Sequence, residues 1–272
     1  MRKKTNWIVL LISCWSVLSA NGVSAVVTDT FDTDPGWEQF NMPFDGNDLG
    51  YSATNYAGTG AGEIGGAFSR TGGIVWYGDT DVGQLQPSTS ISASGSVNPV
   101  SVDSGYNSNS FIGHFDRDGF SDTWPAGTEG VNGVGFHFSE QTIDSLRVFY
   151  RVGLSQGELF TIEGLNTARI WSYEYLPDAG DFGSFSLSIS GIGGGFSTIE
   201  LSEEQRSSIG TLDTFGLAVG PLGGSLDGNL QLYVDDVTYS SASSVPEPTT
   251  LGLFAAGLAG LGFSARRRKQ AH

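Results

Sequence analysis

The stretch SLRVFYRVGL, residues 145–154, decides the fold class, because its side chains alternate between two faces of an extended chain. A period of two residues is that of a β-strand with one face toward a core and one toward water. One face would hold Leu146, Val148, Tyr150 and Val152, and the other Arg147, Phe149 and Arg151. The stretch therefore predicts a half-buried strand.

Strand patterns of the same kind recur along the chain. SFSLSIS (184–190) and NLQLYVDDVTYS (229–240) alternate, and VGFHFS (134–139) and TFGLAVG (214–220) are short apolar runs, with Gly, Asn, Asp and Ser clusters between them. The one helix-like segment is a single turn that Ser202 would cap. Many short strands over about 215 residues predict an all-β protein with one two-sheet antiparallel β-sandwich, a jelly roll, over residues 26–240.

The N-terminus has the three parts of a secretory signal peptide. A basic start is followed by an apolar run over residues 7–18 and by small residues at 23–25. We expect a signal helix in residues 1–25, cut after Ala25 by signal peptidase once the general secretion machinery has exported the chain. The alternative is lipidation of Cys14, the only cysteine. With cleavage at Ala25 the exported protein has no cysteine, so its fold would use no disulfide.

The charge of the body is strongly negative. Of the 13 Lys and Arg, three lie in residues 1–25 and four in residues 266–272, which leaves six, all Arg. They face 28 Asp and Glu between residues 26 and 245, so the body carries a net charge of about −22. Such a surface repels nucleic acid, and we expect no nucleic-acid partner.

The C-terminus differs from the body in composition. A Ser/Pro linker, residues 241–248, contains the sequence Val245-Pro246-Glu247-Pro248. An uncharged apolar stretch over residues 249–265 follows and has the minimum length of a single transmembrane helix. The last segment, residues 266–272, is basic and would stay cytoplasmic, which orients the helix and makes the membrane a transient partner. Its cations are Arg266, Arg267, Arg268 and Lys269.

This order of a Pro-Glu-Pro motif, an apolar helix and a terminal Arg cluster resembles the PEP-CTERM sorting signal of Gram-negative bacteria. The resemblance implies recognition by exosortase, a membrane protease-transpeptidase. It also implies an inner-membrane intermediate, cleavage near Pro-Glu-Pro, and transfer of the body to the cell surface or to extracellular polysaccharide.

The body resembles concanavalin A-like and carbohydrate-binding-module jelly rolls. The segments that carry this resemblance are TDTFDTDPGW (28–37), residues 62–83 and LYVDDVTY (232–239). The last is similar to closing strands in which an Asp helps to bind a structural calcium beside the first strand. Because adjacent strand residues point to opposite faces, one of Asp235 and Asp236 must lie near the core, where a cation shared with Asp29 or Asp32 would neutralise it. The alternative is that both carboxylates are solvated at a strand end.

Glycan binding is the function that the aromatic residues suggest. A sugar ring packs its apolar face on a flat aromatic side chain while polar neighbours bind its hydroxyls. We expect one or two of four tryptophans to line a groove for extracellular polysaccharide; the four are Trp37, Trp76, Trp124 and Trp171.

No catalytic pattern stands out in the sequence. The Glu-x-Asp-x-x-Glu pattern of laminarinase-type enzymes and the His-x-x-x-His spacing are absent. We therefore expect a non-enzymatic protein. The alternatives are a glycoside hydrolase or lyase of lectin-like fold, and a structural matrix protein without a ligand.

Overall fold

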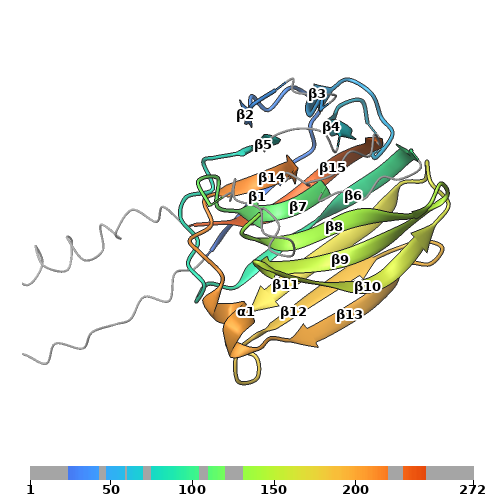
Figure 1. Ribbon diagram of the computed structural model, residues 1–272. Coiled ribbons are helices and arrows are strands. Elements are labelled where there is room, and N and C mark those ends of the chain that lie inside the picture. Colours follow the sequence, from blue (N-terminus) through green and yellow to red (C-terminus); the bar gives the residue numbers. More distant parts are fainter. Residues whose placement is uncertain are drawn as a thin grey trace, which may run out of the picture.

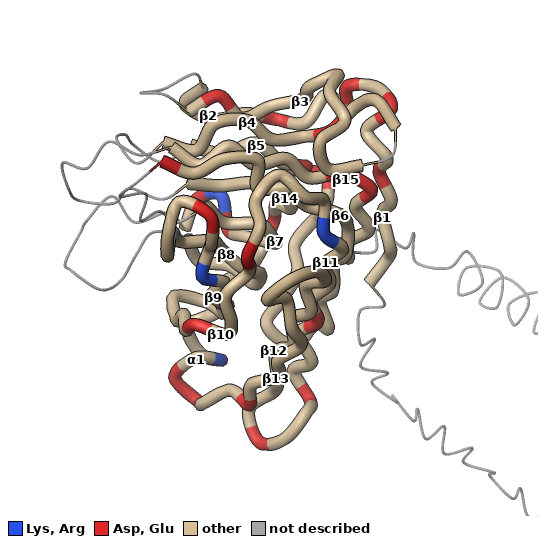
Figure 2. Tube along the Cα trace, turned by 90° about the vertical axis from the view of Figure 1, so that its right-hand side faces the viewer, with Lys and Arg blue, Asp and Glu red and all other residues tan. Residues whose placement is uncertain are grey.

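The computed structural model describes residues 24–42, 47–58, 60–69, 75–103, 110–119, 131–219 and 229–242. In this part of the chain, two antiparallel sheets pack face to face as a sandwich (Figure 1). Figure 2, turned by 90°, shows the two layers side by side, with more Asp and Glu than Lys and Arg positions. The predicted all-β sandwich is confirmed.

The eight-stranded sheet, sheet A, has the order β13-β12-β11-β6-β15-β4-β3, and β1 also pairs with β15. The long strand β15 therefore lies at the centre of the sheet and pairs with β6, β4 and β1. The strands are β1 (Ala25–Asp29), β3 (Gly50–Ser52), β4 (Glu63–Ser69), β6 (Ile91–Val102), β11 (Arg169–Leu176), β12 (Ser184–Ile189), β13 (Gly195–Glu200) and β15 (Asn229–Ser241).

The seven-stranded sheet, sheet B, has the order β10-β9-β8-β7-β14-β5-β2. The chain crosses from sheet A to sheet B early, between β1 and β2, so both sheets contain N-terminal strands. The strands are β2 (Glu38–Phe40), β5 (Val75–Asp79), β7 (Ser110–Phe115), β8 (Gly133–Thr142), β9 (Ser145–Gly153), β10 (Ser155–Glu163) and β14 (Thr214–Val219).

The core lies between the sheets and is built from alternate residues of the strands. On β9, Leu146, Val148 and Val152 are 0% exposed, and Tyr150 packs against the same cluster, as the alternation predicts. On β11, Trp171 and its alternate neighbours are buried, while Ser172 and Glu174 face solvent. Burial of these side chains supplies the main driving force of folding, about 25 cal/mol for each Å² of apolar surface.

A single helical turn, α1 (Glu203–Ser207), lies at one end of the sandwich (Figure 1). Ser202 accepts from the Gln205 backbone N–H, and the Gln205 side chain accepts from the Ser202 N–H, which completes a capping box. The predicted cap at Ser202 is confirmed.

The other predicted helices lie outside the described residues. These are residues 1–23 of the predicted signal helix and the membrane span over residues 249–265, whereas Ala25, the last residue of the predicted signal helix, is the first residue of β1. Within the described residues, the structure contains no helix with the length and apolarity that a membrane crossing requires.

Candidate functional site

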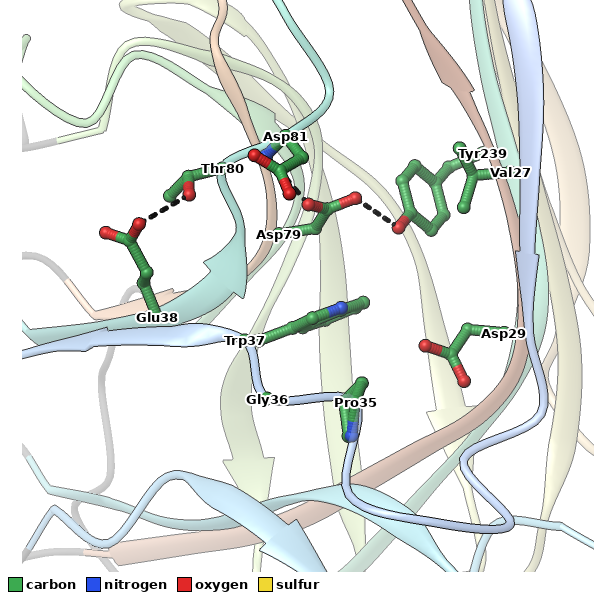
Figure 3. A pocket seen from close by; sticks show the side chains of 10 residues that line it. All are labelled: Val27, Asp29, Pro35, Gly36, Trp37, Glu38, Asp79, Thr80, Asp81 and Tyr239. Carbon is green, nitrogen blue, oxygen red and sulfur yellow. Dashed lines mark hydrogen bonds between the residues drawn. The ribbon is translucent and has the colours of Figure 1, made fainter.

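A cleft of about 440 Å³ opens between the two sheets, where the chain crosses from β1 to β2 (Figure 3). Strands β1 and β15 of sheet A form one wall, and β2 with the end of β5 from sheet B forms the other. We call it the Trp37 cleft; its lining residues are Val27, Asp29, Pro35, Gly36, Trp37, Glu38, Asp79, Thr80, Asp81 and Tyr239.

Trp37 lies in the middle of this cleft, between Pro35 and Asp79 (Figure 3). The indole is partly buried and packs on core aromatics, edge to face with Phe31 at 5.2 Å between ring centroids and tilted on Tyr77 at 5.7 Å. These contacts hold the ring in one orientation while part of its surface remains open to the cleft.

Hydrogen bonds fix the carboxylates around Trp37. Tyr239 Oη donates to Asp79 Oδ2 at 2.6 Å, and the Asp81 backbone N–H donates to Asp79 Oδ1 at 2.8 Å. On the sheet-B wall of the cleft, Thr80 Oγ1 donates to Glu38 Oε1 at 2.8 Å. The bond between Tyr239 and Asp79 ties sheet A to sheet B at the back of the cleft, so the acceptor groups are positioned before any ligand arrives.

The cleft is acidic and rich in acceptors. Burial raises the pKa of Asp29, the charges of Asp79 and Asp32 add to this shift, and the backbone N–H of Phe31 opposes it by donating to Asp29. No Lys or Arg lines the cleft among the described residues. Ionised carboxylates accept hydrogen bonds and repel anions, so the cleft suits hydroxyl groups or cations beside an aromatic ring.

The structure places the predicted tryptophans in different environments. Trp37 lines the cleft, whereas Trp171 is 0% exposed in the core and Trp76 is 6% exposed in a second cluster on sheet B. Trp171 is therefore not accessible to a surface ligand. Trp124 lies outside the described residues.

The predicted pair Asp235 and Asp236 is divided between inside and outside. Asp235 is 1% exposed and Asp236 is exposed, at a β-bulge where Asp236 has a φ of 51°. Burial, together with the charges of Asp236, Glu63 and Asp32, raises the pKa of Asp235 to about 6, although its Oδ1 accepts from the Asp236 backbone N–H. One of the two carboxylates is therefore buried, as predicted, and its raised pKa shows that burial disfavours its charged form.

The four proposed calcium ligands do not form one cluster. Asp29 lines the Trp37 cleft, Asp235 does not, and the charge of Asp32 acts on both of them. Within the described ranges, no three His, Cys, Asp or Glu side chains are grouped to hold a metal ion. Calcium binding stays a prediction.

Sequence reasoning missed most of the cleft. Asp79 and Asp81 follow Trp76 closely in the sequence, but the fold brings them to Trp37, together with Glu38 and Tyr239. Tyr239 is 160 residues from its partner Asp79. No short sequence pattern signals a contact of that range.

The comparison with known families identifies the C-terminus. Residues 244–269 match the family model described as the PEP-CTERM protein-sorting motif. This chain carries a PEP-CTERM sorting motif. The motif implies an exported protein that exosortase recognises and that is processed at the membrane. The match lies outside the described residues and does not concern the sandwich.

Solved structures give only weak similarity to the sandwich. The cellulose induced protein Cip1 is 12% identical, with a TM-score of 0.45 over 78% of this chain and 96% of that one. Lectin II from Ulex europaeus is 11% identical, with a TM-score of 0.45 over 78% and 100%. A family 7 alginate lyase is 10% identical, with a TM-score of 0.41 over 67% and 79%. These values carry no argument about ligand or reaction.

A search among curated proteins gives no match to this sequence.

Proposed function

We propose that this protein is a non-catalytic polysaccharide-binding protein of the cell surface or extracellular matrix of a Gram-negative bacterium, and that it binds uncharged sugar units in the Trp37 cleft. The observation that carries the proposal is the position of Trp37, an oriented and partly open aromatic ring, among four carboxylates and a threonine hydroxyl.

The chemistry of the cleft matches the two-sided chemistry of a sugar ring. The apolar face of a pyranose packs on an indole ring, and its hydroxyls donate to carboxylates. Asp79, Asp81 and Glu38 supply such acceptors along one side of Trp37 (Figure 3). The same carboxylates would repel an acidic sugar.

The sorting motif supports the proposed location of the protein outside the cell. Exosortase would cut the chain near Pro246-Glu247-Pro248 and release the sandwich to the outside, where extracellular polysaccharide is present. Replacing these three residues by alanine should retain the protein at the inner membrane, as cell fractionation would show. Normal release of that variant would refute this route.

Binding in the cleft is tested with two matched variants. A glycan array on the full-length protein selects an uncharged oligosaccharide, and titration calorimetry then compares Trp37→Phe with Trp76→Phe. Both variants exchange an indole for a smaller ring, but only Trp37 lines the cleft. We expect Trp37→Phe to weaken binding about tenfold, and Trp76→Phe to leave it unchanged; equal effects would place the site elsewhere.

The alternative functions give different results in the same assay. New reducing ends during incubation would show a glycoside hydrolase, and Asp29 with Asp79 would then be the first carboxylates to replace, since such enzymes use a pair of them. A binding-negative array would favour a structural matrix protein without a ligand.

A further inference from the structure

A second group of polar side chains lies on the outer face of sheet B, away from the Trp37 cleft. The strand register places His137 of β8 opposite Phe149 of β9, with Arg147 and Arg151 on either side of Phe149 on the same face. We call these four residues the β8–β9 patch. They lie outside the core between the sheets, because the inward face of β9 is the one that holds Leu146, Val148 and Val152.

The decisive feature of the patch is the His137 imidazole. It is 3% exposed, and neither Nδ1 nor Nε2 has a hydrogen-bond partner among the residues that the structure describes. An unsatisfied buried donor or acceptor destabilises the folded state, because the hydrogen bonds that it makes to water in the unfolded chain are lost and not replaced. A neutral imidazole leaves both one N–H and one lone pair unused here, so the sequence retains a costly side chain where phenylalanine would pack.

Arg147 gives the patch a partly exposed positive charge. Its side chain is 37% exposed, and its guanidinium lies over the Phe149 ring, with Cζ 5.5 Å from the ring centroid. Its Nε is buried without a hydrogen-bond partner among the described residues, although Nη2 donates to Ser139 and Nη1 is 3.8 Å from Glu158. The His137 ring also packs on Phe149, edge to face, with 4.9 Å between the ring centroids.

Arg151 adds a second positive charge deeper in the patch. It is 1% exposed, and its Nη2 donates to Gln156 Oε1 at 2.5 Å. Two of the five arginines in the described chain thus share one face of β9, in a body whose net charge is about −22. The patch is therefore a place where this acidic protein offers donors to an anion.

We propose that the β8–β9 patch binds the carboxylate of a uronic-acid sugar, with Arg147 Nε and the His137 N–H as donors and the Phe149 ring as the apolar contact. A sugar hydroxyl would donate to the second His137 nitrogen, so one acidic sugar provides partners for Arg147 Nε and for both His137 nitrogens. Arginine matches the planar carboxylate, and the partly exposed Arg147 and Phe149 provide the approach. Dense polyanions such as nucleic acid are disfavoured by the charge of the body.

This site goes beyond the proposed function and is independent of it. The Trp37 cleft repels anions and would bind uncharged sugars, whereas the patch would bind acidic ones. Loss of either site leaves the other testable.

The test uses full-length protein labelled with ¹⁵N-histidine and three probes: D-glucuronate, D-glucose as its uncharged counterpart, and inorganic sulfate. We expect glucuronate to shift the ring nitrogen signals of His137 and to leave those of His114 in place, with little effect of glucose or sulfate. Equal shifts with sulfate would show that the patch binds oxyanions in general, which would refute a site for a sugar acid. No shift of the His137 signals with glucuronate would also overturn the proposal.

Arg147→Gln and Arg117→Gln provide matched variants. Both arginine side chains are 37% exposed and each faces one carboxylate, but Arg117 contacts Asp213 away from the patch. We expect Arg147→Gln to weaken glucuronate binding at least tenfold, and Arg117→Gln to leave it unchanged. Equal losses in both variants would mean that only the net charge of the protein matters, which would refute the site.

Discussion

His114 and His137 lie on the neighbouring strands β7 and β8 and are almost equally buried, at 0% and 3% exposed. His114 points into the core and links the two sheets: its Nε2 is 2.7 Å from the Ser240 carbonyl oxygen and its Nδ1 is 2.6 Å from Tyr173 Oη. His137 points outward from sheet B and has no such partners within the described residues.

The difference shows how partners separate a structural histidine from a candidate binding residue. A carbonyl oxygen can only accept, so His114 carries its proton on Nε2, and Nδ1 accepts from the Tyr173 hydroxyl. Every polar atom of this bridge is satisfied, and it contributes to stability. The unsatisfied ring of His137 costs stability, and a cost of that kind is expected at sites that bind a ligand.

The largest effect should come from breaking the His114 bridge. His114→Phe leaves the buried Tyr173 hydroxyl without its partner and forces a larger ring into the core, so we expect a loss of about 3 kcal/mol in unfolding free energy. Urea denaturation measures this loss. The double variant with Tyr173→Phe should recover part of it, because both buried polar groups are then removed; an additive loss would show that the bridge is not a unit.

The pH dependence of stability should follow the same bridge. Burial lowers the pKa of His114 to about 4, against the opposing effect of the Ser240 carbonyl. In the unfolded chain the pKa is about 6.5, so the unfolded chain takes up the proton first, and stability present above pH 6.5 is lost as the pH falls toward 4. The contribution of His114 is about 3 kcal/mol.

Asp235 acts in the opposite direction and serves as the control for this pH dependence. Its pKa is raised to about 6, so the folded state takes up a proton before the unfolded state, and the destabilisation that the buried charge causes disappears as the pH falls from 6 toward 4. Urea denaturation at a series of pH values from 4 to 7.5 gives the unfolding free energy at each pH. This free energy should depend more steeply on pH in Asp235→Asn than in the unmodified protein. A shallower dependence in the variant would contradict the raised pKa of Asp235.

His137→Phe should have a smaller effect of opposite sign. It removes two unsatisfied buried atoms and keeps a ring against Phe149, so we expect a gain of about 1 kcal/mol and a higher melting temperature. The same variant should lose glucuronate binding. Destabilisation would show that the imidazole has a stabilising role, and the contrast with His114 would fail.

The smallest effects should come from the two matched arginines. Partly exposed ion pairs contribute about 0–1 kcal/mol, so Arg147→Gln should change stability by about 0.5 kcal/mol or less. Arg117 is closer to its carboxylate, at 3.0 Å compared with 3.8 Å, so Arg117→Gln should lower the unfolding free energy slightly more. A large loss in Arg147→Gln would mean that Arg147 supports the sheet rather than a ligand.

The strands were predictable because the signal for a strand is local. Alternation in residues 145–154 named the inward residues of β9, and the same rule identified Leu230, Leu232 and Val234 on β15, which are buried. The sorting motif was predictable for the same reason, since it is a contiguous segment that a partner recognises by its sequence. The alternation did not reveal that Arg151, on the outward face, is 1% exposed.

The sites depended on contacts that no local pattern contains. Trp37, Asp79 and Tyr239 meet because one segment crosses between the sheets and because β15 returns to the centre of sheet A. The identical residue type at His114 and His137 has opposite surroundings because one side chain faces the other sheet and one faces away. The sequence by itself determined the strand pattern and the sorting signal of this protein. The tertiary structure decided which side chains meet, because burial and pairing depend on residues more than a hundred positions apart.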